Sequence, residues 1–442
     1  MGIPFYYADL IKKYPDIIQH PNNIDVLFFD YNGLIHPIAH ETICKGKCKS
    51  DEEFFHLLWK KTVELVSMIK PAKYIISIDG VAPLAKVNQQ RKRRYISVVN
   101  KSWDTNAITC GTPFMDNLNK YIKNRHNNVD TMYNNGEGEH KILDYIHNDN
   151  STSNNYLIHG LDADLILLSL MSNKSDNIYL MREQNNIITY ISIKKIKQYI
   201  ELEWSSIFSK DADIIKSYCV MLSIMGNDFI PHPIGLSISS NGINILKTIC
   251  KNTCLISKQD TININKADLH LIFKNLIYYE DKCMINEPKN WRKNYYKNEV
   301  YIEDISQSCK LYIDGIFWTY NYYNKDINKI DHSWYYPYLG CPSISDIANY
   351  LTTYEYTPSY DNNFINSKEQ LIIVMPKTSI NVLPKDLHKY IIDPLYGLDH
   401  MFVTDYKLIK YLKKHEWEYV PYLPLIDIEY IRSIFADELE VY

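Results

Sequence analysis

Short apolar runs, each ending at a carboxylate or a glycine, alternate with helical patterns through the first half of the chain. In chain order these segments are Asp25–Asp30, Phe54–Ile69, Tyr74–Asp79, Gly138–His147 and Asn155–Gly160. Such alternation predicts an α/β fold, with a mostly parallel sheet covered by helices. Ligands bind beyond the carboxyl ends of the strands in these sheets. We therefore expect Asp30, Asp79 and the residues after Gly160 to lie at one edge, where a functional site would form.

The second half of the chain has a different pattern. Strand signals fade from about Ile238, and helical patterns rich in tyrosine and tryptophan follow. We therefore predict an α/β core over residues 1–237 and a largely helical second region over residues 238–442. Residues 281–300 are polar, charged and aromatic, and we expect a linker there.

The overall charge excludes a uniformly basic nucleic-acid-binding protein, because 48 Lys and Arg residues stand against 52 Asp and Glu residues. Binding to nucleic acid would require the cations to gather in one place. The nine cysteines are an odd number, which argues against a disulfide framework and favours a reducing compartment. No run approaches the roughly 18 to 20 apolar residues of a membrane span. We therefore expect an intracellular protein without a membrane partner.

Seven carboxylates stand at strand ends, glycine turns or predicted helix boundaries. They are Asp30, Asp79, Glu137, Glu139, Asp162, Asp164 and Asp228. Taken singly, each is more simply explained as a turn residue or a helix cap. Gathered in one pocket, they would repel one another unless cations neutralised them. Oxygen ligands suit Mg²⁺ or Mn²⁺, and two such ions can activate water and stabilise the leaving oxygen in phosphodiester cleavage.

A basic segment follows shortly after Asp79. On a helix its key residues would share one face, because they are spaced i, i+4, i+7 and i+8; they are Lys86, Gln90, Arg93 and Arg94. A solvated face or a nuclear localisation signal is the ordinary explanation for such a run. Beside an acidic metal site, however, these cations and the amide would form a socket for a phosphate group.

Longer motifs resemble those of the Xrn-type 5′→3′ exoribonucleases. They occur in the family's order and cover nearly the whole chain. The first half contains MGIPFYYADLIKKYP, DYNGLIHP, IDGVAPLAKVNQQRKRR, GEGEHKILDYI, HGLDADLILLSL and GNDFIPH, and the second half contains IDGIFWTYNYY, WYYPY and EQLIIVMP. The resemblance implies a nuclease core related to the PIN and flap-endonuclease folds, with the helical second region completing the active site. The chain ends where the family's common core ends, so we expect a short form that consists of the catalytic core.

The resemblance also implies a role for each group of residues. It assigns the binding of two Mg²⁺ or Mn²⁺ ions to the seven carboxylates, and the 5′-phosphate socket to Lys86, Gln90, Arg93 and Arg94. It assigns stacking on the first base to His36 and Trp334, although this chain has His332 and Trp334 where the family usually has two tryptophans. The implied activity is processive hydrolysis of single-stranded RNA with a 5′-monophosphate to mononucleotides, in mRNA or other RNA decay.

Two other functions share some of these features. A flap-endonuclease-like 5′ nuclease acting on DNA would have a similar acidic core, but the sequence has no helix-hairpin-helix pattern for duplex DNA. A catalytically dead RNA-binding scaffold would usually lack metal ligands, and all of them are present here.

We further expect a monomer in the cytoplasm, with the nucleus as the alternative. Functional coupling to a decapping enzyme, which would generate 5′-monophosphate ends, is also expected.

Overall fold

Six strands form one sheet in the first half of the chain. The computed structural model describes residues 3–97, 103–160, 162–184, 187–324, 330–357, 364–413 and 415–436. The strands are β1 (Val26–Asp30), β2 (Lys73–Ser77), β3 (Val129–Asp130), β4 (Tyr156–His159), β5 (Ile178–Gln184) and β6 (Ile187–Ser192). Their order is β3-β2-β1-β4-β5-β6; β6 is antiparallel to β5 and all other neighbours are parallel. The predicted mostly parallel sheet is therefore confirmed.

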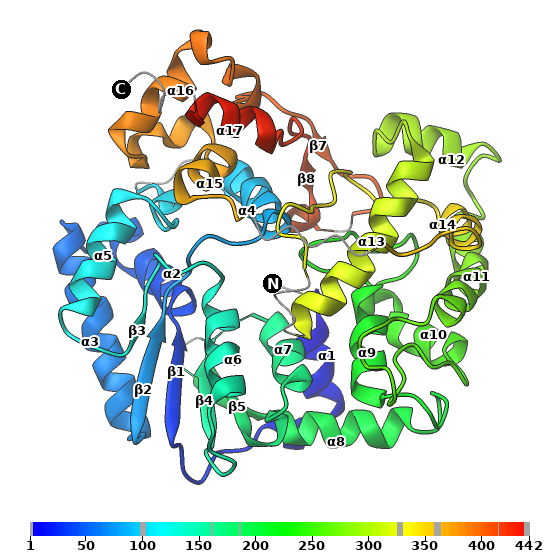
Figure 1. Ribbon diagram of the computed structural model, residues 1–442, viewed down its shortest axis with the longest axis horizontal. Coiled ribbons are helices and arrows are strands. Elements are labelled where there is room, and N and C mark those ends of the chain that lie inside the picture. The colour runs from blue at the N-terminus through cyan, green and yellow to red at the C-terminus, as the bar shows by residue number, and fades with distance from the viewer. Residues whose placement is uncertain are drawn as a thin grey trace.

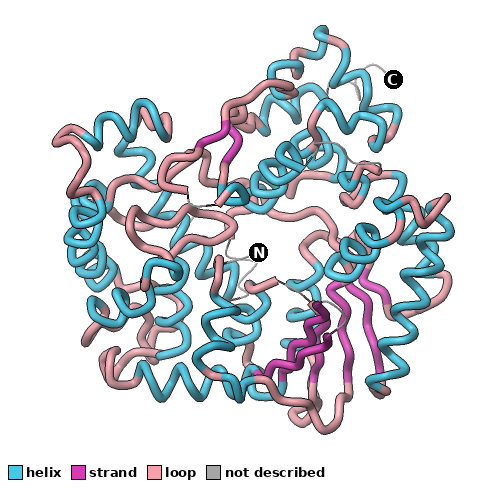
Figure 2. Tube along the Cα trace, turned by 180° about the vertical axis from the view of Figure 1, so that it is seen from behind, coloured by secondary structure: helices cyan, strands magenta, loops and turns pink. Residues whose placement is uncertain are grey.

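Helices cover both faces of this sheet (Figures 1 and 2). The helices of the first half are α1 (Tyr6–Lys13), α2 (Asn32–Glu41), α3 (Asp51–Ile69), α4 (Leu84–Ser97), α5 (Pro113–Lys123), α6 (Gly138–Asn148), α7 (Asp164–Met171), α8 (Ile193–Trp204) and α9 (Ile214–Ser223). Alternate side chains of a strand point to opposite faces. Accordingly, Val26 and Phe28 of β1 pack in a cluster with α6, α7 and α8, whereas Leu27 and Phe29 pack with α2, α3 and α5.

The second half is largely helical, as predicted. Its helices are α10 (Gly242–Ile249), α11 (Lys266–Cys283), α12 (Trp291–Asn294), α13 (Ile305–Tyr323), α14 (Ile344–Leu351), α15 (Ser367–Val374), α16 (His388–Ile392) and α17 (Ile428–Ala436), and its short strands are β7 (Leu408–Ile409) and β8 (Val420–Pro421). Figure 1 shows α10, α11 and α14 on the side away from the sheet, and α15, α16 and α17 close to α4. Within the described ranges, no helix has both the length and the apolar character that crossing a membrane requires.

The two halves share their hydrophobic cores. One cluster joins β1 and α6–α9 to α11, α13 and α14, and another joins α2, α3 and α5 to α15, α16 and α17. The segment expected to contain a linker includes the end of α11 and all of α12, and it buries Tyr295 and Tyr296 in a third, smaller cluster. The domain boundary near residue 237 stays a prediction, but residues on both of its sides contribute to the same packing.

Candidate active site

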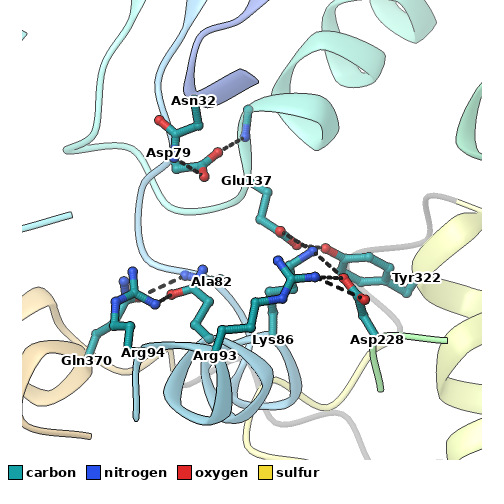
Figure 3. A network of polar contacts seen from close by, with 12 residues as sticks. Asn32, Asp79, Ala82, Lys86, Arg93, Arg94, Glu137, Asp228, Tyr322 and Gln370 are labelled. Carbon is teal, nitrogen blue, oxygen red and sulfur yellow. Dashed lines mark hydrogen bonds and ion pairs between the residues drawn. The ribbon is translucent and has the colours of Figure 1, made fainter. Parts of the chain in front are cut away.

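A cavity of about 580 Å³ lies between the carboxyl ends of the central strands and helix α4. Its lining combines five of the predicted carboxylates, the whole predicted phosphate socket and the predicted stacking histidine: Asp30, Asp79, Glu137, Glu139, Asp162, Lys86, Gln90, Arg93, Arg94 and His36. Figure 3 shows Lys86 and Arg93 of α4 pointing toward the carboxylates of Glu137 and Asp228. The structure therefore brings the acidic and the basic motifs of the sequence into one space.

Strand ends and helix starts position six of the seven carboxylates. Asp30 is the last residue of β1, and Asp79 lies two residues beyond the end of β2. The remaining four stand at or just before helix N-termini, where the helix dipole favours negative charge; they are Glu137 and Glu139 at α6, and Asp162 and Asp164 at α7. The parallel topology thus aims all six at one edge of the sheet.

Glycine at position 138 allows α6 to approach the strand ends closely. Its N–H donates to Asp79 Oδ1 at 2.6 Å, and the side-chain amide of Asn32 donates to the other oxygen of the same carboxylate. A Cβ at position 138 would lie 2.9 Å from Asp30 Oδ1 and 3.1 Å from the carbonyl oxygen of Ser77. Any larger residue would therefore push α6 away from the carboxylates that it helps to orient.

Burial and mutual repulsion disfavour the ionised form of several of these carboxyl groups. Burial, followed by the charges of Asp79 and Asp162, raises the pKa of Asp30 well above its usual range. Burial also raises the pKa of Glu137 to about 7, against the opposing effect of Lys86. For Asp164, burial and the nearby charge of another carboxylate raise the pKa to about 6. Cations placed among these groups would lower the pKa values again.

Asp228 reaches the site from the loop that follows α9. Its carboxylate oxygens lie 3.2 Å from Lys86 Nζ and 3.3 Å from Arg93 Nη2. Although burial pushes the pKa of Asp228 upward, these two cations hold it below its usual value. Neither Asp228 nor Asp164 lines the open cavity. Asp228 contacts Lys86 and Arg93, which do line it, and the charge of Asp164 acts on Glu139, so all seven predicted carboxylates are close to one another.

The donor set fits a divalent cation. The seven carboxylates offer the oxygen ligands that Mg²⁺ and Mn²⁺ prefer. Glu137, Glu139 and His140 have possible ligand atoms within 4.8 Å of one another. Moreover, Asp164 Oδ1 is buried without a hydrogen-bond partner among the described residues, and buried polar atoms normally have a partner. A bound cation would satisfy this oxygen, so the cluster is suited to divalent metal.

Lys86 connects the acidic and basic sides of the cavity. Its ammonium group lies 2.8 Å from Glu137 Oε1 as well as 3.2 Å from Asp228 Oδ2, and all three side chains are buried. Burial alone would lower the pKa of Lys86, but the surrounding carboxylates raise it well above its usual value. The lysine is therefore charged, and it holds two carboxylates in addition to lining the cavity.

The rest of the predicted socket also lies on the cavity face of α4. Arg94 Nη1 donates to Gln90 Oε1 at 3.4 Å, and Arg94 Nη2 donates to Thr109 Oγ1 at 2.8 Å. Arg91 points the other way, is buried, and donates to two carbonyl groups of the second region. The helical face deduced from the sequence is thus the one that faces the cavity.

Of the two predicted stacking residues, the structure places only His36 at the cavity. The ring of Trp334 stacks on Trp318, with 5.2 Å between ring centroids and 28° between planes. His332 is buried against Phe364, and its carbonyl accepts a hydrogen bond from the N–H of Leu84 at the start of α4. Base stacking by His36 and Trp334 stays a prediction, and for Trp334 the geometry gives it no support.

The motifs did not reveal the part that α13 has in this site. The hydroxyl group of Tyr322 donates to Glu137 Oε2 (Figure 3), and the centroid of its ring lies 4.0 Å from that of His140. Tyr322 also stacks on Trp318, with 5.0 Å between centroids. The only signal in the sequence was the aromatic motif around Tyr322, and nothing in that motif points to a partner 185 residues away.

Family models match both halves of the chain. The model described as the XRN 5′-3′ exonuclease N-terminus matches residues 1–101 and 96–184, and the Xrn1 helical domain matches residues 274–437. The chain belongs to the Xrn family. The first model contains every residue that lines the cavity, and the second contains Tyr322, whose hydroxyl group contacts Glu137.

Curated relatives of this chain are named 5′-3′ exoribonucleases. Human 5′-3′ exoribonuclease 1 is 25% identical over an alignment that covers 97% of this chain and 33% of the human protein. For 5′-3′ exoribonuclease 2 of Debaryomyces hansenii the identity is 29%, over 64% of this chain and 38% of the relative. The chain therefore spans about a third of the length of these relatives.

Solved structures of the bacteriophage T5 D15 protein are also similar. One was co-crystallised with metal ions, and one is a flap endonuclease complex with DNA and metal ions; their TM-scores are 0.37 and 0.36, at 12% identity and over 68% of this chain. Similarity at this level carries no argument about activity. The α/β fold class rests on the sheet order and the helical layers described above.

Proposed function

We propose that this Xrn-family chain is a 5′→3′ exoribonuclease that hydrolyses single-stranded RNA carrying a 5′-monophosphate. One observation carries the proposal: five carboxylates and the basic face of α4 line the same cavity. A carboxylate cluster suits the metal-dependent cleavage of a phosphodiester, and a neighbouring cationic face suits the recognition of a terminal phosphate. The names of the curated relatives support RNA as the substrate and 5′→3′ as the direction.

The basic face would bind the terminal phosphate. Arg93 is 37% exposed and Lys86 is buried, so the socket would hold the phosphate between a deep ammonium group and a more accessible guanidinium group. Guanidinium groups match phosphate oxygens in a two-pronged arrangement. A 5′-hydroxyl end carries no charge for these donors, and we expect a capped end to be excluded from the socket.

The carboxylates would hold two Mg²⁺ or Mn²⁺ ions. Ions of this kind activate water and stabilise the leaving oxygen of the scissile bond when they are bound. Lys86 would keep Glu137 and Asp228 in place through its two buried contacts. Tyr322 would orient Glu137 from the opposite side through its hydroxyl group. Asp79 would be fixed by the donors of Gly138 and Asn32.

Advance along the strand would depend on His36. Its exposed ring, at the cavity, could stack on the first base, and this kind of contact is worth about 1–3 kcal/mol for any base. After each cut the mononucleotide would leave and the new 5′ phosphate would enter the basic socket, which would make the reaction processive. A role in RNA decay, coupling to a decapping enzyme, a monomeric state and a cytoplasmic location stay predictions.

A panel of single strands tests this proposal. RNA of one sequence is prepared with a 5′-monophosphate, a 5′-hydroxyl or a 5′ cap, together with a 5′-phosphorylated DNA strand, and each is incubated with and without Mg²⁺. We expect Mg²⁺-dependent release of mononucleotides from the 5′-monophosphate RNA, and far slower release from the other three. Equal digestion of capped and monophosphorylated RNA would refute the socket. Faster digestion of the DNA would favour a DNA-directed 5′ nuclease instead.

A further inference from the structure

A second cavity, of about 210 Å³, lies on the other side of α4 from the candidate active site, and the two cavities share no lining residue. Its wall includes the loop from Met225 to His232, together with Tyr336, Tyr338 and the segment that precedes β8. Lys92 and Lys413 line this cavity from two different elements. The two cavities are thus separate, although both use α4 as a wall and one of the seven carboxylates, Asp228, lines the second.

Neither of the two lysines forms a close ion pair. Among the described residues, neither Lys92 nor Lys413 has a carboxylate within 4 Å, and no side-chain hydrogen bond satisfies either ammonium group. Burial, followed by the charges of Arg91 and Lys413, lowers the pKa of Lys92 to about 8. Burial also lowers the pKa of Lys413, against the opposing charge of Glu418. Two cations held close together in a partly buried space form a site that an anion would stabilise.

The carboxylates in this second cavity are already engaged. Asp228 forms its ion pairs with Lys86 and Arg93 on the side of the active site. Glu418 accepts a hydrogen bond from the backbone N–H of His415 at 2.8 Å. Positive charge is therefore available to a ligand from the two lysines.

Aromatic rings stand at the rim of the same cavity. Trp417 lines the cavity and is 52% exposed. The ring of His415 stacks on it, with 5.6 Å between centroids and 10° between planes, and Phe5 packs edge-on at 5.7 Å. An exposed, pre-stacked indole beside unpaired cations has the two features that bind a nucleotide: a surface for the base and a charge for the phosphate.

We propose that this second cavity binds a nucleoside 5′-monophosphate, with the phosphate between Lys92 and Lys413 and the base on Trp417. The volume of about 210 Å³ is less than the roughly 300 Å³ at which pockets for whole ligands begin. Only part of the nucleotide would therefore fit inside the cavity. The cavity would enclose the phosphate end and leave the base at the rim. A mononucleotide is also the product of the proposed exonuclease, so the choice of this ligand rests on the proposed function.

Photo-labelling tests the site without requiring turnover. The whole chain is incubated with 8-azidoadenosine 5′-monophosphate in the presence of EDTA, irradiated and digested, and the labelled peptides are mapped by mass spectrometry. We expect a label on the segment 415–418 that AMP prevents and adenosine does not. The Lys92→Ala/Lys413→Ala variant should need at least roughly 100-fold more nucleotide for half-maximal labelling, because it lacks two charge-assisted contacts, each worth about 10- to 100-fold.

Matched variants separate binding from damage to the fold. Lys60→Ala removes an exposed lysine from α3, remote from this cavity, and should label like the wild type. Trp417→Phe should keep the effect of AMP, whereas Trp417→Ala should lose most of the affinity. Thermal melting of each variant would show whether the fold is retained.

Several results would overturn the proposal. Labelling confined to the active-site cavity would do so, as would equal protection by adenosine and AMP. Unchanged labelling of the folded double-lysine variant would also overturn it. So would a double-lysine variant that loses affinity for long RNA but not for AMP. The last result would assign the surface to the RNA strand. The outcome is independent of the proposed activity: a chain that labels as expected but fails to digest RNA would refute the exonuclease proposal alone. A chain that digests RNA but does not label at 415–418 would refute this inference alone.

Discussion

The acidic and the basic sides of the active-site cavity are built in different ways. Six of the seven carboxylates stand at strand ends and helix starts, so the backbone of the α/β core places them. The cations come from the single helix α4, which is held by contacts with the second region. Arg91 donates to the carbonyls of Met401 and Pro424, and the N–H of Leu84 donates to the carbonyl of His332. The acidic side is thus a property of the core, whereas the basic side depends on both regions.

This difference separates chemistry from substrate recognition. Removing a carboxylate should stop cleavage without disturbing the packing, because these side chains lie at the edge of the sheet and repel one another. Altering the cations should instead change which 5′ end is accepted. The contact between Tyr322 and Glu137 is the exception, because there the second region reaches the acidic side directly.

The largest effect is expected on the acidic side. Asp162→Ala or Glu137→Ala should abolish Mg²⁺-dependent cleavage, since either change removes a proposed ligand that positions a metal at the scissile phosphate. Cleavage is measured on 5′-monophosphate RNA, and thermal melting checks the fold. Near-normal turnover by a folded variant would show that the acidic side is not the catalytic centre.

On the basic side, Arg93→Ala should lower kcat/KM for 5′-monophosphate RNA by about 10- to 100-fold, which is the usual effect of losing one charge-assisted hydrogen bond. Cleavage of 5′-hydroxyl RNA should change much less, so the preference between the two ends should shrink. Arg125→Ala serves as a control, because Arg125 is exposed and stacks on the ring of Tyr121 at the end of α5. If both substrates lose activity by the same factor, Arg93 supports the fold or Asp228 rather than the phosphate.

The contact between the two regions can be tested with adjacent tyrosines. Tyr322→Phe removes the hydroxyl that donates to Glu137, and we expect roughly 10-fold higher Mg²⁺ for half-maximal activity, as for other groups that orient metal ligands. Tyr323→Phe is the matched control, because the Tyr323 hydroxyl is buried without a hydrogen-bond partner among the described residues. Equal Mg²⁺ requirements in both variants would limit Tyr322 to a packing role.

The smallest effect on a single cut is expected from His36→Ala. Removing the stacking surface should shorten the run length on long RNA and cause stalling at hairpins, while the first nucleotide of an unstructured oligomer is still removed. Run length is measured after excess competitor RNA is added to the preformed complex. An unchanged run length would limit His36 to a structural role in α2.

The sequence predicted those parts of the site that short segments determine. The apolar runs before Asp30 and Asp79 located the strand ends, and helical spacing identified the face of α4 that carries Arg93. It did not predict the contacts that join distant segments. The hydrogen bond from Tyr322 to Glu137 depends on how α13 packs against α6, and no local pattern encodes this. Trp334 shows the same limit. The family resemblance implied a stacking role, which stays a prediction, but no local pattern encodes the packing that places its ring on Trp318.

The direction of degradation tests the central claim most directly, namely that the cavity cuts RNA from a phosphorylated 5′ end. A 5′-monophosphate RNA is labelled either at its terminal phosphate or at its 3′ end, and both forms are digested in Mg²⁺ under the same conditions. We predict that the 5′ label appears at once as a mononucleotide, while the 3′ label stays in long fragments until the strand is consumed. Early release of the 3′ label, or internal fragments from both forms, would contradict the account.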